Sequence, residues 1–160
     1  MANRIPNRVS AFANRLLAPE RPQAPRTILV IDDEEGIRKF VERVLQHAGY
    51  TTVVASNGPE ALQAAANLPS LDLVVTDVMM PEMSGCEVAR RLRQQNPDLK
   101  VLYVTGYSDR LFDVKVMMWE NEAFVEQPCS VKALLQAVSL LWSQHIESIP
   151  QSGYAARLAS

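Results

Sequence analysis

The sequence predicts an α/β fold, in which a doubly wound, five-stranded parallel sheet carries helices on both faces. Short apolar or β-branched runs alternate along the chain with stretches of helical periodicity. Acidic residues stand directly after the first and third of these runs. With 160 residues, 48% of them apolar and 21% charged, the chain has room for one domain of ordinary size and flanking segments. A second catalytic or DNA-binding domain would not fit comfortably.

The predicted strands are short runs with few polar residues, as expected for strands that are covered on both faces. They lie at 27–31, 51–54, 72–76, 99–104 and 123–125. Right-handed crossovers leave few ways to connect five such strands through helices. The flavodoxin-like strand order 2-1-3-4-5 is the commonest for this number of strands, and ligands in such sheets bind beyond the carboxyl ends of the strands.

The predicted helices fill the intervals between the strands. In the first, the spacing i, i+3, i+4, i+7 marks a face that packs on a sheet, formed by Ile37, Phe40, Val41, Val44, Leu45 and Ala48, and Gly49 ends the helix. Further helices are expected at 58–67, 84–95, 108–120 and from 131 to about 145. Ser84 followed three places later by Glu87 is a capping-box signature. In the last helix one face carries Val131, Leu134, Leu135, Val138 and Trp142.

The chain divides into three parts. Residues 18–26 hold three prolines and no apolar periodicity, which indicates an extended linker. We therefore expect a basic N-terminal extension with a Pro-rich linker at 1–26, the domain at 27–146 and a C-terminal tail at 147–160. The net charge is −2, but residues 1–26 carry five arginines against one glutamate, so the rest of the chain carries about −6. This balance gives no reason to expect direct DNA binding by the domain.

Cys86 and Cys129 show no spacing that suggests a zinc site or a disulfide framework, so two buried free thiols in a reducing cytoplasm are expected. The sequence has no apolar stretch that approaches the length of a membrane span, and the N-terminus lacks the apolar centre of a signal peptide. The predicted location is the cytoplasm.

Three aspartates carry the most specific information about function. Asp32 and Asp33 close the first apolar run, and Asp77 closes the third. If these runs are neighbouring parallel strands, the three carboxylates meet at one end of the sheet. Like charges this close repel unless a cation lies among them, so the cluster predicts a hard metal ion and phosphate chemistry. Taken singly, the acids also suit a helix start, and Asp77 followed by Pro81 also suits a turn.

From about Thr27 to His145 the sequence resembles the receiver domain of bacterial two-component response regulators. Four segments carry the resemblance, in the expected order and at fitting spacings: Ile-Leu-Val-Ile-Asp-Asp-Glu-Glu (28–35), Thr-Asp-Val-Met-Met-Pro-Glu-Met-Ser-Gly (76–85), Val-Thr-Gly-Tyr-Ser-Asp (104–109) and Phe-Val-Glu-Gln-Pro (124–128).

The resemblance implies that Asp77 accepts a phosphoryl group from a histidine kinase or a phosphotransfer protein. It also implies that Mg²⁺ is bound by Asp33, Asp77 and the backbone carbonyl of Met79, and through water by Asp32. Mg²⁺ favours such oxygen ligands, keeps several waters and neutralises charge on a transferring phosphoryl group. Such a protein is a regulator and not an enzyme, since its catalysis is limited to its own phosphorylation and dephosphorylation.

The resemblance also assigns a switch and reveals a departure. Thr105 matches the switch hydroxyl that binds a phosphoryl oxygen, and Phe124 matches the aromatic residue that moves with the neighbouring loop. Gln127 stands where the family usually has a lysine that pairs with the phosphoryl group, and glutamine brings no charge. The alternative hypothesis is therefore a phosphorylation-independent pseudo-receiver scaffold. Arg38, one helical turn past the acids, is a candidate substitute cation, although we expect it to be solvated.

Two other functions on the same fold fit poorly. A flavin-binding electron carrier would not place the acids from Asp32 to Glu35 against a flavin phosphate. An acid-phosphatase-like enzyme that uses a DxD nucleophile does not match Met79, two places after Asp77.

The expected partners are proteins. We expect a stand-alone receiver that acts by passing on phosphoryl groups or by docking to an unknown downstream protein. In the family, partners commonly meet the surface of the fourth helix, the fifth strand and the fifth helix, where Met117, Met118 and Trp119 would supply apolar contacts. Residues 4–17 place apolar and arginine side chains on adjacent flanks of a helix, a pattern typical of weak membrane or partner contact. So short a helix is marginal in water, so we expect it to be unfolded when unbound.

Overall fold

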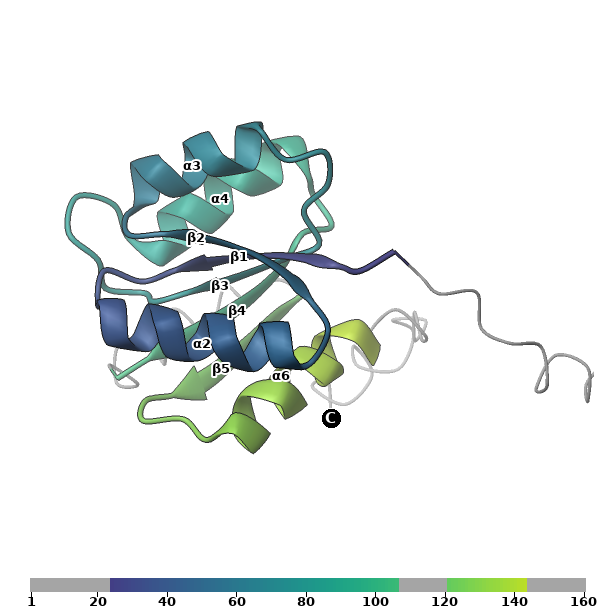
Figure 1. The fold of residues 1–160 in the computed structure, drawn as a ribbon. Coiled ribbons are helices and arrows are strands. Elements are labelled where there is room, and N and C mark those ends of the chain that lie inside the picture. The colour runs from purple at the N-terminus through teal and green to yellow at the C-terminus, as the bar shows by residue number, and fades with distance from the viewer. Residues whose placement is uncertain (1–23, 107–120, 144–160) are drawn as a thin grey trace, which may run out of the picture.

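The computed structural model describes residues 24–106 and 121–143, and within these ranges the chain forms five strands and four α-helices (Figure 1). The strands are β1 (Thr27–Ile31), β2 (Thr51–Ala55), β3 (Leu73–Thr76), β4 (Lys100–Thr105) and β5 (Glu122–Glu126). The helices are α2 (Glu35–His47), α3 (Gly58–Ala66), α4 (Gly85–Gln95) and α6 (Val131–Ser143). The N-terminal extension, the helix expected at 108–120 and the C-terminal tail lie outside the described residues.

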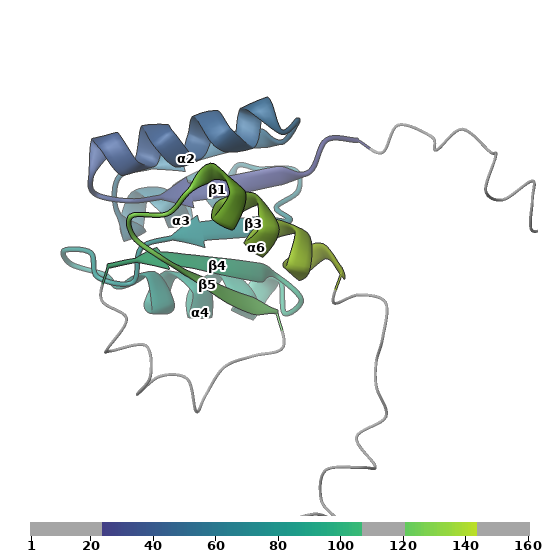
Figure 2. The same ribbon diagram turned by 90° about the horizontal axis from the view of Figure 1, so that it is seen from below.

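The five strands form one parallel sheet in the order β2-β1-β3-β4-β5, which confirms the predicted fold class and strand order. Figures 1 and 2 show α3 and α4 on one face of the sheet and α2 and α6 on the other. Ile31 of β1 is in register with Thr76 of β3. The residues that follow these two strands therefore emerge side by side at the same edge.

The three central strands, β1, β3 and β4, are buried on both faces, which explains their largely apolar sequences, whereas the edge strands β2 and β5 are only partly buried. Leu29, Ile31 and Val74 belong to the core beneath α3 and α4, whereas Ile28 and Val30 belong to the core beneath α2 and α6. All of these side chains are almost fully buried. Alternate residues of one strand thus supply two separate cores, and the sheet is a rigid platform for the loops at its edge.

Helix α2 packs through a narrower face than its apolar spacing predicts. Val41 and Leu45 are buried, but Phe40 is 36% exposed, so its assignment to the sheet-facing side was wrong. Val131 at the start of α6 is likewise exposed. Val131 is the first residue of α6 and Phe40 lies in the second turn of α2, so both are near the start of their helices. As expected, the chain turns at Gly49, whose φ of 94° lies in the left-handed region that favours glycine.

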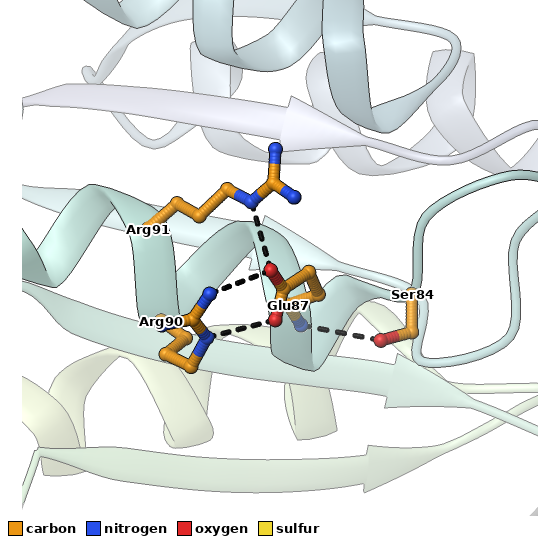
Figure 3. Close-up of polar contacts among 4 residues, drawn as sticks. All are labelled: Ser84, Glu87, Arg90 and Arg91. Atoms are coloured by element: carbon orange, nitrogen blue, oxygen red, sulfur yellow. Dashed lines mark hydrogen bonds and ion pairs between the residues drawn. The ribbon is translucent and has the colours of Figure 1, made fainter.

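Helix α4 begins with only half of the predicted capping box. The Ser84 Oγ accepts a hydrogen bond from the Glu87 N–H at 3.2 Å. The Glu87 carboxylate, however, accepts hydrogen bonds from Arg90 and Arg91 and does not return to the Ser84 N–H (Figure 3). Two arginines one turn along the helix compete successfully for the carboxylate, since both pairs have the spacing at which helix side chains meet.

Side chains at the other end of the sheet fasten the start of the domain to α6. The Trp142 Nε1 donates a hydrogen bond to the Tyr50 hydroxyl at 3.0 Å. The Arg26 guanidinium lies 4.1 Å from the centroid of the Trp142 ring, in a cation–π contact.

Cys86 and Cys129 are free thiols and are half-buried, less than the sequence predicted. Among the described residues, none of the helices has the length and apolar character of a membrane span.

Candidate metal centre

Asp32, Asp33 and Asp77 lie together at the carboxyl edge of the sheet, as the strand order requires. Asp32 and Asp33 follow β1, and Asp77 follows β3, the strand that pairs with β1. Each aspartate offers one carboxylate oxygen to a group whose atoms all lie within 4.8 Å of one another. The predicted cluster therefore forms, and no other group of described residues gathers at least three potential metal ligands in this way.

The donor set fits a hard divalent cation. Three carboxylates bring up to three negative charges into one small volume, and only oxygen ligands are present. Mg²⁺ is typically held by one or two carboxylates and several waters, and exposed Asp33 leaves the site open to solvent. The cluster thus offers enough charge for Mg²⁺ and keeps positions free for water or a phosphoryl oxygen.

Asp32 is the most buried of the three, with 4% of its surface exposed. Burial, together with the charges of Asp77 and Asp33, raises its pKa from 3.8 to about 6. The N–H of Glu34 donates to the Asp32 Oδ1 at 2.8 Å and opposes the shift. Glu34, at the N-cap position of α2, makes no side-chain capping bond.

Asp77 is half-buried, and burial raises its pKa as well. A hydrogen bond from the Thr105 side chain and backbone N–H groups of Met79 and Val78 lower it again. The Met79 N–H lies 3.4 Å from the Asp77 Oδ1. Opposed influences of this kind keep a carboxylate ionised and oriented while it is partly shielded from water.

The backbone of Asp77 is fixed by contacts that the sequence analysis did not identify. The Thr76 hydroxyl donates to the Asp77 carbonyl at 2.9 Å, and the Gly85 N–H donates to the Val78 carbonyl at 3.0 Å. A Cβ added at Gly85 would overlap the Asp77 carbonyl oxygen. Gly85 lies in the matching segment 76–85, but only the three-dimensional structure shows that the first residue of α4 must be glycine for this close approach.

The two residues assigned to the switch lie in β4 and β5. Thr105 is fully buried at the end of β4 and contacts Asp77, as expected for a hydroxyl near the acids. Phe124 is partly buried and stacks on Tyr103, with the ring centroids 5.0 Å apart and the planes at 18°. The pairing of β4 with β5 brings Phe124 beside Tyr103. The switching roles of Thr105 and Phe124 and the metal-binding role of the Met79 carbonyl stay predictions.

Gln127 reaches the edge of the sheet from β5, but its side chain bonds to the neighbouring strand. Its Nε2 donates to the Val104 carbonyl at 3.2 Å, and its backbone N–H donates to the Thr105 carbonyl at 3.0 Å. The bond between Gln127 and Pro128 is a cis peptide. The glutamine amide thus satisfies a backbone carbonyl of β4 and brings no charge to the cluster.

Arg38 is not simply solvated, and the prediction that favoured this was wrong. Its Nη1 donates to the backbone carbonyl of Asp32 at 2.7 Å, and its side chain is partly buried. Hydrogen bonds from Ser56 lower the pKa of Glu60 at the start of α3, and the charge of Arg38 adds to this. The turn from β1 into α2 brings Arg38 back over the end of β1, a contact that sequence spacing alone does not reveal.

A groove of about 560 Å³ lies beside the acids, between the start of α2 and the segment that joins β5 to α6. Its apolar side chains come from Ile37, Phe40, Pro128 and Cys129, and its polar ones from Glu34 and Gln127. The partly exposed ring of Phe40 does not pack in the core of the domain and instead lines this groove.

The chain is similar to proteins that contain one common module. It is 44% identical over 117 residues to the response regulator MprA of Mycobacterium sp. (strain KMS), covering 73% of this chain and 50% of MprA. It is 38% identical over 113 residues to the sensor kinase CckA of Brucella abortus (strain 2308), covering 70% of this chain and 12% of the kinase. The chain thus spans half or less of the length of these two relatives.

Solved structures show the same fold at similar coverage. A response regulator receiver domain protein from Clostridium thermocellum has a TM-score of 0.66 and 30% identity, covering 75% of this chain and 96% of that protein. The response regulator TrrA from Thermotoga maritima, solved in complex with Mg(2+)-BeF, has a TM-score of 0.65 and 35% identity, covering 72% of this chain and 98% of TrrA.

The model of the response regulator receiver domain matches residues 28–139, a range that runs from β1 into α6 and contains all three aspartates. Together with the strand order and the acidic cluster, this match shows that the chain belongs to the response regulator receiver domain family.

Proposed function

We propose that Asp77 accepts a phosphoryl group from a phosphohistidine of a histidine kinase or phosphotransfer protein. The receiver domain is a signalling module of two-component systems, and its acidic cluster supports this specific role. In the proposed step an Asp77 carboxylate oxygen attacks phosphorus, the bond from phosphorus to the histidine nitrogen breaks, and that nitrogen keeps the electron pair. The single observation that carries the proposal is the convergence of Asp32, Asp33 and Asp77 within 4.8 Å.

The protein contributes orientation and charge control to this step. Hydrogen bonds from Thr105 and from the backbone of Met79 and Val78 favour the ionised, nucleophilic form of Asp77 and oppose the rise in its pKa that burial causes. The close packing of Gly85 against the Asp77 backbone limits movement of the acceptor. Such pre-positioning removes part of the entropic barrier to a reaction between two molecules.

Asp33 and Asp77 are the proposed direct Mg²⁺ ligands, with the carbonyl of Met79, and Asp32 is proposed to bind through water. When bound, Mg²⁺ offsets the mutual repulsion of the carboxylates and the negative charge of the transferring phosphoryl group. The relative TrrA, 35% identical, was solved with Mg(2+)-BeF, which supports a magnesium site in this chain.

Gln127 is expected to weaken the response to phosphorylation. A lysine at this position would place a positive charge near the phosphoryl group, whereas the Gln127 amide donates to the Val104 carbonyl. Hydrogen bonds to charged groups are worth about 1.5–3 kcal/mol, so the lost charged partner corresponds to a factor of roughly ten to one hundred. This contact is the observation that favours the alternative function, a pseudo-receiver scaffold that binds its partner without phosphorylation.

Intact-mass spectrometry after incubation with Mg²⁺ and a small phosphodonor tests the proposal. The wild-type protein should gain one phosphoryl group, and Asp77→Asn should gain none. Asp98→Asn is the matched control, because Asp98 is an exposed aspartate before β4, outside the acidic cluster, and this variant should behave as wild type.

The variant Gln127→Lys separates the two candidate functions. If phosphorylation is the function, wild type is modified and the lysine variant is modified with a longer-lived product. If wild type gains no phosphoryl group while Gln127→Lys does, the protein is a scaffold whose acidic cluster no longer accepts a phosphoryl group. Modification of Asp77→Asn to the same extent as wild type would exclude Asp77 as the acceptor.

The proposed setting is the cytoplasm, where thiols such as Cys86 and Cys129 stay reduced.

The proposed output is a contact with a downstream protein. Phosphorylation at Asp77 adds charge directly beside Thr105 at the end of β4, and a local charge of this kind can bias a two-state loop.

A further inference from the structure

The loop between β3 and α4, residues 77–84, connects the proposed acceptor Asp77 to the first turn of α4. It also carries Met79, whose backbone carbonyl is a proposed Mg²⁺ ligand. A backbone carbonyl binds an ion well only if the surrounding structure holds it in one place. The contacts that fix this loop therefore bear directly on the metal site.

The middle of the loop contains a strained turn. The Met83 N–H donates to the Pro81 carbonyl at 2.8 Å, which is the hydrogen bond of a three-residue γ-turn. Glu82, at the centre of this turn, has a φ of 68°, in the left-handed region that a residue with a Cβ rarely adopts. Such a conformation persists only where surrounding contacts over-determine it. Contacts outside the turn must therefore hold the loop in this form.

The two ends of the loop are joined beside the acceptor. The Gly85 N–H donates to the Val78 carbonyl at 3.0 Å, and Gly85 packs closely against the Asp77 carbonyl. Met79 and the strained turn lie between these ends. They need a support of their own.

Met83 provides this support through a close contact with the first residue of α3. A Cβ added at Gly58 would lie 2.7 Å from the Met83 Cβ, 2.9 Å from its Sδ and 3.0 Å from its Cγ. Gly58 is buried, and Met83 packs against the core beneath α3 and α4. These two helices contact each other on the same face of the sheet (Figure 1). Only glycine at position 58 therefore lets the Met83 side chain approach α3 so closely.

The start of α3 is the firmly held side of this contact. The Asn57 Oδ1 accepts a hydrogen bond from the Glu60 N–H at 2.9 Å. The N–H and the hydroxyl of Ser56 both donate to the Glu60 carboxylate, at 3.2 and 2.6 Å. Pro59, in the first turn, restricts the backbone further. A methyl group added at Gly58 would therefore displace the strained loop rather than the capped helix.

We propose that Gly58 and Met83 are positioning residues for the metal site, because their contact holds the loop 77–84 in its strained form and keeps the Met79 carbonyl available to Mg²⁺. Neither residue is a proposed ligand, and both act through the backbone of the loop. The inference rests on the proposed function, in which the ion is bound at the acidic cluster. Losing an outer support of a metal site typically lowers the affinity for the metal by roughly 10- to 100-fold.

Mg²⁺ titration by calorimetry on the full chain, well below its melting temperature, tests the positioning role. Gly58→Ala should bind Mg²⁺ roughly tenfold more weakly than wild type. Gly36→Ala is the matched control and should bind as wild type does. Gly36 also lies in the first turn of a helix, but a Cβ added there meets none of the described atoms within 4 Å.

A second control separates position from stability. Val138→Ala shortens a fully buried side chain in the core beneath α2 and α6, away from the loop. It should lower the melting temperature and leave the Mg²⁺ affinity unchanged. If Val138→Ala weakens Mg²⁺ binding as much as Gly58→Ala does, stability alone sets the affinity and the proposal is overturned.

A double variant tests the contact between the two residues. Met83→Gly removes the three described atoms that lie closest to the added methyl group, so it should itself weaken Mg²⁺ binding. In this background Gly58→Ala should have little further effect. Losses of affinity that simply add in the double variant would overturn the proposal, since the two residues would then act independently.

Nuclear magnetic resonance separates a failure of this inference from a failure of the proposed function. In the metal-free protein the Gly85 N–H should exchange with solvent roughly tenfold faster in Gly58→Ala than in wild type, because the loop opens more often. Equal exchange rates would overturn the inference, whatever the protein binds.

When Mg²⁺ is added, the resonance of the Met79 carbonyl carbon should shift in wild type and shift less in Gly58→Ala. A wild-type protein that binds Mg²⁺ through Asp33 and Asp77 while this resonance stays in place would overturn the positioning role and leave the acidic site intact. A wild-type protein that binds no Mg²⁺ would contradict the proposed function, and the inference would fall with it.

Discussion

Asp32 is the residue of the cluster whose charge depends most on its neighbours, because burial raises its pKa to about 6. In the metal-free protein the folded state then binds a proton more tightly than the unfolded state does. The contribution of Asp32 to stability is fully present below the ordinary aspartate pKa of 3.8 and is lost as the pH rises through about 6. The sign follows mainly from burial, which disfavours the charged form of Asp32, and the charges of Asp77 and Asp33 act in the same direction.

We predict that wild type, measured with a chelator present, melts at a lower temperature at pH 7.5 than at pH 5. Asp32→Asn should reduce this dependence, since the amide stays neutral throughout. Thermal denaturation of both proteins at the two pH values measures the difference. If the melting temperature changes between pH 5 and pH 7.5 by the same amount in wild type and in Asp32→Asn, the pKa of Asp32 is ordinary.

Arg38 is predicted to position the two aspartates that follow β1, without touching the proposed ion. Its bond to the Asp32 carbonyl fixes the turn that carries Asp32 and Asp33. Arg38→Gln should weaken Mg²⁺ binding by roughly tenfold, as expected for the loss of one charged hydrogen bond. Lys39→Gln is the control, because Lys39 is exposed and forms an ion pair with the exposed Glu35 at the surface. Mg²⁺ titrations of the two variants should differ, and equal affinities would assign Arg38 no positioning role.

At the scale of elements, the junction between β3 and α4 is the most tightly packed part of the site. Gly85→Ala would drive a methyl group into the Asp77 carbonyl, so either α4 or the acceptor must move. Overpacking of this kind typically costs about 1–3 kcal/mol. We predict a lower melting temperature and a slower gain of the phosphoryl group than in wild type.

Gly36→Ala is a matched control for this substitution. Gly36 also lies in the first turn of a helix, but a Cβ added there meets nothing within 4 Å. Alanine at this position should leave stability and phosphorylation close to wild type or raise stability slightly, since alanine favours helix. Similar losses in both variants would contradict the account, because the effect at Gly85 would then not come from the contact with the Asp77 carbonyl.

The positions of strands and helices were largely predictable from the sequence, whereas contacts between elements were not. Strands that are buried on both faces must be apolar, so the runs ending at Asp32 and Asp77 predicted β1 and β3 to within one residue. The apolar spacing of α2, in contrast, placed Phe40 on the sheet. Periodicity gives the direction of a side chain, but it does not say where the core ends and the exposed rim begins.

At the scale of the whole molecule, the acidic site follows from topology. Asp77 reaches Asp32 and Asp33 only because β3 pairs with β1, which the strand order 2-1-3-4-5 provides. The order itself was predictable from right-handed crossovers. The roles of Arg38, Gly85 and the Gln127 amide were not predictable from the sequence. Each depends on a short contact with the backbone of another element.

Mg²⁺ titration by isothermal calorimetry tests the central claim of a magnesium-binding acidic site most directly. Wild type should bind one Mg²⁺ per chain, and saturation at about one hundred times the dissociation constant should stabilise the fold by about 2.7 kcal/mol. Asp33→Asn and Asp77→Asn should each abolish most of the binding heat, while Asp98→Asn should bind as wild type does. A wild-type protein that takes up no divalent cation, or that binds Mg²⁺ equally well without Asp33 and Asp77, would contradict the account.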